Sequence, residues 1–227
     1  MWIFPLAAAG IALVFAALLG KRFMSRRRPS QLLWAAAMLM YSAAAAAVFL
    51  GVLDGWSVAE YRVYWLFGAV LNVPYLAAGE AHLLVRNRVA LRIVDVLLAV
   101  ATVVALALVF SADISQSLLA GHLPAGKTVW AGQPSMRALA SAYSYIAYLY
   151  LVAGTIWSAV KVRRQPAMRD RFLGTLGIAI GATIVAAGAA FAVKGLAQGF
   201  SLTLSVGIAV MFWGSLRAGR PVKTNKA

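Results

Sequence analysis

Cysteine is absent from this chain of 227 residues, so it holds no disulfide, iron–sulfur cluster, thiolate zinc site or palmitoylation site. Acidic residues are scarce: six Asp and Glu stand against 21 Lys and Arg, and the formal net charge is +15. Only 12% of the residues are charged, 63% are hydrophobic, and the mean hydropathy is +0.84. This composition is too apolar for a soluble domain or a disordered chain, and it indicates an integral membrane protein.

Catalytic motifs are absent as well, since the sequence contains no H-E-x-x-H, G-x-S-x-G or P-loop pattern. Its two histidines, His82 and His122, are expected near opposite surfaces of the membrane and therefore cannot share a haem or a zinc ion. The last apolar stretch lacks the lysine that a retinal Schiff base requires. We therefore predict a non-enzymatic protein without a metal or cofactor.

Seven apolar stretches are long enough to cross a bilayer as helices, since the hydrocarbon core requires about 20 residues. They cover residues 2–20, 31–52, 60–85, 92–111, 137–160, 172–195 and 199–216. We predict an all-α fold, a polytopic seven-transmembrane helix bundle that forms one domain over residues 1–227 and ends in a short basic tail, 217–227. The one long connection, 111–136, could be a lid, a ligand loop or a simple tether, with Trp130 at the membrane interface.

The basic residues are distributed unevenly between the two predicted membrane surfaces. The connections 21–28, 86–92 and 161–171, together with the tail, hold 17 Lys and Arg, whereas the other side holds four. By the positive-inside rule, we expect the N-terminus outside and the C-terminus in the cytoplasm of a plasma-membrane protein. We expect these cations to contact anionic lipid headgroups rather than nucleic acid, because they flank helix ends and the tail has no aromatic side chain.

One stripe of the third predicted span is polar. Its members recur at helical spacing and face one side of the helix: Asn72, Tyr75, Gly79 and His82. Pro74 removes a backbone donor beside this stripe, so it should kink the helix and free a carbonyl about one turn earlier, near Val70. The stripe could form a ligand or water site, although packing against neighbouring helices is the simpler interpretation.

Glu80 is the only carboxylate well inside a predicted span. Three states are open to it: the side chain reaches the membrane surface, pairs with an arginine of the 86–92 connection, or stays protonated inside the bundle. We favour surface contact or pairing. His82 lies about 160° away around the helix, so the two side chains do not form an acid–base dyad. Asp95 is expected to open the fourth span, where a carboxylate favours the helix N-terminus.

The fifth predicted span also presents a polar face. At helical spacing this face consists of Ser141, Tyr145, Tyr148 and Thr155. Tyr143 and Tyr150 point away from it, and we expect them near lipid. We expect the face to meet Asn72 and Tyr75, either around a polar cavity between helices three and five or through interhelical hydrogen bonds.

Glycine recurs along the sixth predicted span, at Gly174, Gly177, Gly181 and Gly188. Small residues at such spacing let another helix backbone approach closely. The partner could be a helix of the same chain, a second copy in a homodimer or another membrane protein. We favour packing within the chain, because small residues are abundant in every span.

The order of basic turns, apolar spans and the long loop along the chain is similar to that of a known group of membrane proteins. Arg26-Arg27-Arg28-Pro29 leads into a second span with Trp34, the third span runs from Tyr61-Arg62 through Gly68 and Pro74 to Leu83, and a long outer loop precedes the basic connection Arg163-Arg164-Gln165. This pattern resembles the seven-transmembrane input domains of bacterial sensor histidine kinases and related stand-alone actinobacterial membrane proteins. The sequence reaches Ala227 without a kinase or other output domain, so the resemblance implies a sensor that signals through a separate protein.

Two functions are consistent with these features. The first is a receptor-like or accessory module that binds a small ligand or a membrane partner through the face between helices three and five or through helix six. The second is a small-solute transporter or proton-coupled channel, with Glu80 as the titrating group and Asn72, Tyr75 and His82 along the path.

Overall fold

The computed structural model describes residues 3–121, 123–162 and 169–218, and within these ranges the chain is helical apart from its connections, with no strand. The predicted all-α fold is therefore confirmed. In chain order the elements are α1 (Ile3–Arg26), α2 (Pro29–Asp54), α3 (Val58–Val63), the π-helix η1 (Tyr64–Leu71), α4 (Asn72–Leu84), α5 (Arg88–Ser111), the 3₁₀-helix η2 (Gln116–Leu119), α6 (Gly126–Val129), α7 (Pro134–Val162), α8 (Arg169–Val193) and α9 (Ala197–Ala218).

Six of these helices are long and apolar enough to cross a membrane: α1, α2, α5, α7, α8 and α9. They match six of the seven predicted spans and indicate a multi-pass integral membrane protein. The third predicted span differs, because it is built from α3, η1 and α4, which follow one another without a gap from Val58 to Leu84. Long apolar helices alone therefore account for six crossings and not for seven.

Some predictions concern residues outside the described ranges. These residues are His122, the basic connection Arg163-Arg164-Gln165, the first residue of the first predicted span, and the part of the basic tail beyond Ala218.

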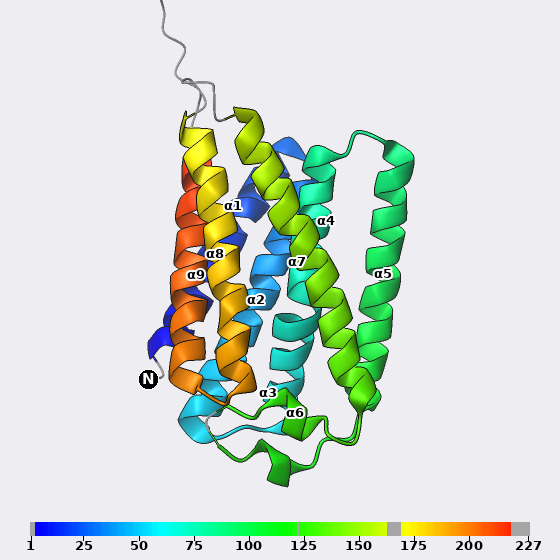
Figure 1. Cartoon of the computed structure of the whole chain (residues 1–227), viewed down its shortest axis with the longest axis vertical. Coiled ribbons are helices and arrows are strands. Elements are labelled where there is room, and N and C mark those ends of the chain that lie inside the picture. The colour runs from blue at the N-terminus through cyan, green and yellow to red at the C-terminus, as the bar shows by residue number, and fades with distance from the viewer. Residues whose placement is uncertain (1–2, 122, 163–168, 219–227) are drawn as a thin grey trace, which may run out of the picture.

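Six helices form a closed ring (Figure 1). Around the ring, α1 contacts α2, α2 contacts α4, α4 contacts α7, α7 contacts α8, α8 contacts α9, and α9 returns to α1. A cavity of about 30 Å³ lies at the centre, and every helix of the ring contributes to its lining, including Phe15, Trp34, Leu76, Leu151 and Met211. The cavity has room for about one water molecule, but its apolar lining offers too few polar partners to hold one.

Helix α5 stands outside this ring, beside α4 and α7 (Figure 1). Only 11% of the most apolar stretch of α5 is buried in the bundle, against 50% of the corresponding stretch of α9. Ala105 and Val109 are its buried side chains, while the faces turned outward carry large aliphatic residues. Side-chain hydrogen bonds with α4 and α7 also join it to the bundle.

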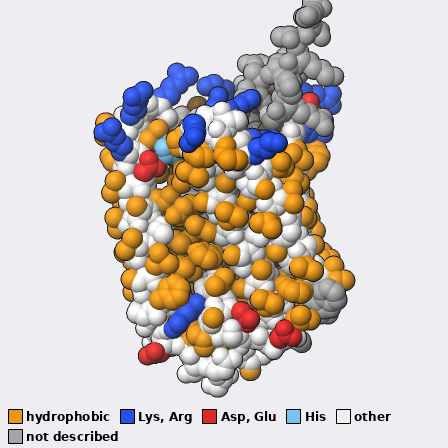
Figure 2. All heavy atoms as spheres, turned by 180° about the vertical axis from the view of Figure 1, so that it is seen from behind, with side chains coloured by type: hydrophobic (Ala, Val, Ile, Leu, Met, Phe, Trp, Pro, Cys, Tyr) orange, Lys and Arg blue, Asp and Glu red, His pale blue; other side chains and the backbone are white. Residues whose placement is uncertain are grey.

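The two ends of the bundle differ in their connections and in charge. The start of α1 and the end of α9 lie at opposite ends (Figure 1). The α1–α2 and α4–α5 turns share one end, and Figure 2 shows Lys and Arg gathered there above a broad hydrophobic surface. The α2–α3 turn, the α8–α9 turn and the loop between α5 and α7 lie at the other end, which we call the loop end.

Local sequence signals explain where α3 and α5 begin. Ser57 and Glu60 form a reciprocal capping box at the start of α3, with bonds of 3.2 and 2.9 Å between side chains and backbone amides. Asn87 caps α5 by accepting hydrogen bonds from the amides of Val89 and Ala90. The expectation that Asp95 opens this helix was wrong, because α5 starts seven residues earlier, at Arg88.

The glycines of α8 face α9. A methyl group added at Gly181 would lie 2.6 Å from the carbonyl oxygen of Gly207, and one added at Gly214 would lie 2.6 Å from the carbonyl oxygen of Gly174. Gly177 and Gly188 likewise meet α9, at Trp213 and Thr203. The structure thus places all four predicted packing glycines in a contact within the chain, where the absence of side chains lets the two backbones touch.

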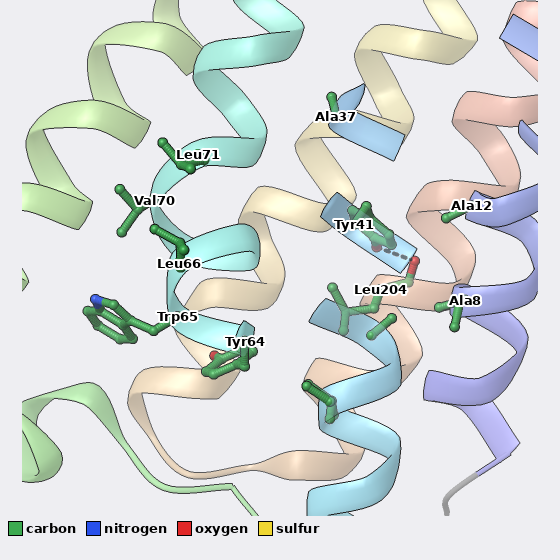
Figure 3. Close-up of a cluster of buried hydrophobic side chains, with 14 of the residues drawn as sticks. Ala8, Ala12, Ala37, Tyr41, Tyr64, Trp65, Leu66, Val70, Leu71 and Leu204 are labelled. Atoms are coloured by element: carbon green, nitrogen blue, oxygen red, sulfur yellow. Dashed lines mark hydrogen bonds between the residues drawn. The ribbon is translucent and has the colours of Figure 1, made fainter. Parts of the chain in front are cut away.

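Small and hydroxyl-bearing side chains join α1, α2 and α9 (Figure 3). Ala8 and Ala12 of α1 are completely buried, and Ser42 of α2 donates to the carbonyl of Ala9 at 2.9 Å. Tyr41 crosses to α9 and donates its hydroxyl hydrogen to the carbonyl oxygen of Leu204 at 2.8 Å. Each hydroxyl therefore has a backbone acceptor on a neighbouring helix, as the apolar surroundings demand.

Candidate functional site

The third predicted span changes helical register next to Pro74. Residues 64–71 form the π-helix η1, in which hydrogen bonds join residues five apart. Pro74 lies in α4, beyond the end of η1 at Leu71, and it has no amide hydrogen for the carbonyl one turn earlier, at Val70. The hydroxyl of Ser144 in α7 donates to the adjacent carbonyl oxygen, that of Ala69, at 2.7 Å. The irregular part of the span beside Pro74 is thus hydrogen-bonded to a neighbouring helix.

The polar stripe of this span is divided between two neighbours. Asn72 is buried and donates to the carbonyl of Ala37 in α2 at 2.6 Å. Tyr75 instead shares a hydrogen bond of 3.2 Å with Thr102 of α5. The side chains of the polar stripe therefore do not surround one common cavity. The two contacts agree better with the interpretation that the stripe packs against neighbouring helices.

The other two members of the stripe also make specific contacts. The indole ring of Trp34 packs against Gly79, and it would collide with any side chain added at that position. The indole nitrogen of Trp34 donates to the carbonyl of Leu76 at 3.0 Å. The imidazole Nε2 of His82 lies 2.8 Å from a carboxylate oxygen of Asp95. This pair joins α4 to α5, and it was not among the partners expected for either residue.

The polar face predicted for the fifth span is turned away from the third. Ser141 is exposed, and Tyr145 is 70% exposed. Tyr148 reaches Thr183 of α8 at 3.2 Å, and Thr155 bonds back to its own helix. The expectation that this face meets Asn72 and Tyr75 was therefore wrong.

The residues that do connect α7 to its neighbours are Tyr143 and Ser144. Tyr143, which we had expected near lipid, donates to the carbonyl of Ala101 in α5 at 3.3 Å, while Ser144 reaches Ala69. Tyrosine tolerates both lipid surfaces and helix contacts, so its spacing alone does not identify the buried face.

Glu80 is enclosed between α4 and α7. The side chain is 4% exposed, and its Oε2 atom has no hydrogen-bond partner. Among the described residues the ion pairs are His82–Asp95 and Arg217–Asp170, so Glu80 belongs to neither. The favoured expectation that Glu80 pairs or reaches the surface was wrong, because Gly154 lets α7 lie directly against the carboxyl group.

Aromatic rings concentrate at the loop end of the bundle, in a group that we call the aromatic cluster. Its members come from the α2–α3 turn, α3, η1, the end of α6 and α9: Trp56, Tyr61, Tyr64, Trp65, Trp130 and Phe200. Neighbouring ring centroids are 5.5 to 6.1 Å apart, mostly edge-on or tilted, with Tyr61 and Trp65 stacked. All six rings are buried.

Three polar atoms inside this cluster lack hydrogen-bond partners: the hydroxyl of Tyr61 and the indole Nε1 atoms of Trp65 and Trp130. The Tyr61 hydroxyl and the Trp130 nitrogen are close to each other but do not reach hydrogen-bond geometry. Buried polar groups in proteins are nearly always paired, so three such atoms among touching rings are an unusual feature of this cluster. Because an indole nitrogen can only donate, a partner for Trp65 or Trp130 would have to offer an acceptor atom.

The long loop covers the aromatic cluster. Gln116 donates to the carbonyl of Trp56 at 2.6 Å, and Arg62 donates to the carbonyl of Ala112 at 2.8 Å. At Gly126 the backbone comes so near Trp65 that an added methyl group would lie 2.5 Å from its ring. Trp130 is 0% exposed, so its predicted place at the membrane interface was wrong.

The cluster was missed in the sequence, although a signal for it exists. Tyr61, Tyr64 and Trp65 recur at offsets of three and four, which places three aromatic rings on one helix face. Nothing in the spacing shows that Trp130, from a loop far along the chain, completes the group. Comparisons with protein-family models, curated proteins and solved structures give no match to this chain.

Proposed function

We propose that this protein is a receptor-like module that crosses the membrane seven times, with α3, η1 and α4 together as the third crossing. Residues 58–84 would span about 40 Å at 1.5 Å per residue, more than the roughly 30 Å of a bilayer core. The start of α1 and the end of α9 lie at opposite ends of the bundle, which supports an odd number of crossings. The basic end then faces the cytoplasm, and the loop end with the aromatic cluster faces outside.

The aromatic cluster is the proposed recognition site, and its three unpartnered polar atoms are the observation that carries this proposal. Two of them are indole donors, so the site favours a ligand with hydrogen-bond acceptors such as carbonyl, ether or carboxylate oxygens. The surrounding rings favour an apolar or planar body. The ligand class is therefore a small, largely apolar molecule with one or two acceptor oxygens.

The described parts of the long loop, 112–121 and 123–133, act as the lid of this site. The rings touch one another in the closed arrangement, so a ligand enters only when the loop lifts Trp130 away from Tyr61 and Trp65. The loop is held by side-chain hydrogen bonds to backbone carbonyls, including those of Gln116 and Arg62, and by the buried side chains of Leu119 and Leu123. Opening therefore exposes apolar side chains of the loop, and a bound ligand would have to offset that cost. Lid movement would be passed to a partner protein, as the resemblance to input domains implies.

The test is retention of a small molecule by protein purified from its native membranes in mild detergent, read by native mass spectrometry. The double variant Trp65→Phe/Trp130→Phe keeps aromatic rings but removes both indole donors. We expect a bound molecule on the wild type and its loss from this variant.

The matched control is Trp157→Phe, because Trp157 is 69% exposed on α7 and is not part of the aromatic cluster. This variant should retain the same bound mass as the wild type. The proposal is contradicted if the wild type is recovered without any small molecule, or if the double variant keeps the same molecule at the same occupancy.

A further inference from the structure

A second unusual group lies near the opposite, basic end of the bundle. Glu80 is in the last part of α4, four residues before the helix ends at Leu84. Its carboxyl group points at α7, where a methyl group added at Gly154 would lie 2.8 Å from the carboxyl carbon and 3.0 Å from Oε1. The other carboxyl oxygen, Oε2, is buried and has no hydrogen-bond partner.

Among the residues that the structure describes, the titratable and charged groups around Glu80 do not neutralise it. On α7, the nearest titratable side chain to Gly154 in sequence is Tyr150, one turn earlier, and it is neutral at ordinary pH. On α4 and α5, His82 and Asp95 are paired with each other at 2.8 Å. The arginines of the nearby turn, Arg86 and Arg88, are exposed, and neither forms an ion pair with Glu80.

An ionised carboxylate in this position would be unstable. It would lack both a counter-ion and the water that solvates a charge, and burial without either is heavily penalised. Addition of a proton removes the charge with no change in the helix positions. The contact with the Gly154 backbone also leaves no space for hydration on that side, so ionisation requires α4 and α7 to separate.

We propose that Glu80 is a proton-binding site at the contact between α4 and α7. The carboxyl group is protonated while the two helices touch, and it releases its proton when the contact opens to water at the basic end. This site is distinct from the aromatic cluster, and it does not depend on whether the cluster binds a ligand.

The direct test is the infrared carbonyl band of a neutral carboxylic acid in wild-type protein reconstituted in lipid at neutral pH. We expect this band, with its shift in heavy water, in the wild type and in Asp95→Asn, and we expect its absence in Glu80→Gln. Asp95 is the matched control, because its side chain is half exposed and already paired with His82. A wild-type spectrum without this band would overturn the proposal.

A second measurement needs no variant and therefore does not depend on the folding of Glu80→Gln. Dicyclohexylcarbodiimide partitions into the bilayer, where a carboxylic acid adds across one C=N bond and its proton moves to nitrogen. We expect mass spectrometry to locate this adduct on Glu80, with a yield that falls as the pH rises and the acid form is depleted. Modification of Glu80 by a water-soluble carbodiimide instead would contradict the proposal, because it would place the carboxyl group in water.

Discussion

The hydroxyl group of Ser144 donates a hydrogen bond of 2.7 Å to the carbonyl oxygen of Ala69, five residues before Pro74. This oxygen belongs to the π-helix η1, whose hydrogen-bond register differs from that of the α-helices on either side. A serine on α7 thus bonds to the backbone of a different membrane segment. This contact also fixes which face of α7 is directed at η1.

Removal of this donor tests the contact. We expect Ser144→Ala to lower the free energy of unfolding by about 1 kcal/mol, because it removes a hydrogen bond between α7 and η1 in apolar surroundings. Ser141→Ala, on the exposed side of the same helix, should change it by less than about 0.5 kcal/mol. Thermal unfolding in detergent compares the two variants, and equal losses would contradict the assigned contact.

The loop contact at Gly126 yields a second prediction. In Gly126→Ala the added methyl group would collide with the Trp65 ring, so we expect the lid to stay partly open and hydrogen exchange in residues 112–133 to rise. Gly132→Ala is the matched control, since the space around Gly132 is open and lies in the same loop. The lid assignment fails if both variants exchange at the wild-type rate.

The α8–α9 contact yields a third prediction. We expect Gly181→Ala to destabilise the protein by roughly 1–3 kcal/mol, because its methyl group would meet the backbone of Gly207. Gly20→Ala in α1 adds a methyl group in open space, and it should stabilise the protein by roughly 0.5–1 kcal/mol. If Gly181→Ala keeps full stability but changes the oligomeric state, the glycines serve a contact between chains instead.

The charge state of Glu80 has a consequence for stability. A neutral, unpaired carboxyl group should tolerate an amide, so we expect Glu80→Gln to change the free energy of unfolding by less than about 1 kcal/mol at neutral pH. Loss of one partner of a buried ion pair costs about 3–5 kcal/mol. A loss in that range, measured by thermal unfolding, would show that Glu80 has a cationic partner.

Composition and spacing predicted the features that depend on a single helix. The lengths of six helices follow from the thickness of the bilayer. The break beside Pro74 follows from its missing amide hydrogen, and the close approach at Gly181 follows from its missing side chain. The hydrogen bond from Ser144 to the carbonyl of Ala69 was not among the expected contacts.

The errors arose where two segments meet. Ser141 and Ser144 are three residues apart, and polarity alone does not show which of them faces the bundle when both sides of the helix contain tyrosine. The isolation of Glu80 depends on Gly154 of α7, and the burial of Trp130 depends on its contact with Trp65, and both partners are distant in sequence. Such contacts follow from helix order and tilt, which composition does not encode.

The membrane path of residues 58–84 can be measured directly, because the chain contains no cysteine that would react in the background. Asp54 and Arg88 are exposed residues on either side of this segment, and Ser117 is exposed in the lid. Single-cysteine variants at these positions report which side of the membrane each one occupies when whole cells are treated with a membrane-impermeant maleimide.

We predict that Asp54→Cys and Ser117→Cys react from outside on intact cells, whereas Arg88→Cys reacts only after the cells are permeabilised. That result places α3, η1 and α4 across the membrane and the aromatic cluster on the outer side. Equal reaction of Asp54→Cys and Arg88→Cys from the same side would show that residues 58–84 do not cross the membrane, and it would contradict the seven-crossing receptor proposed here.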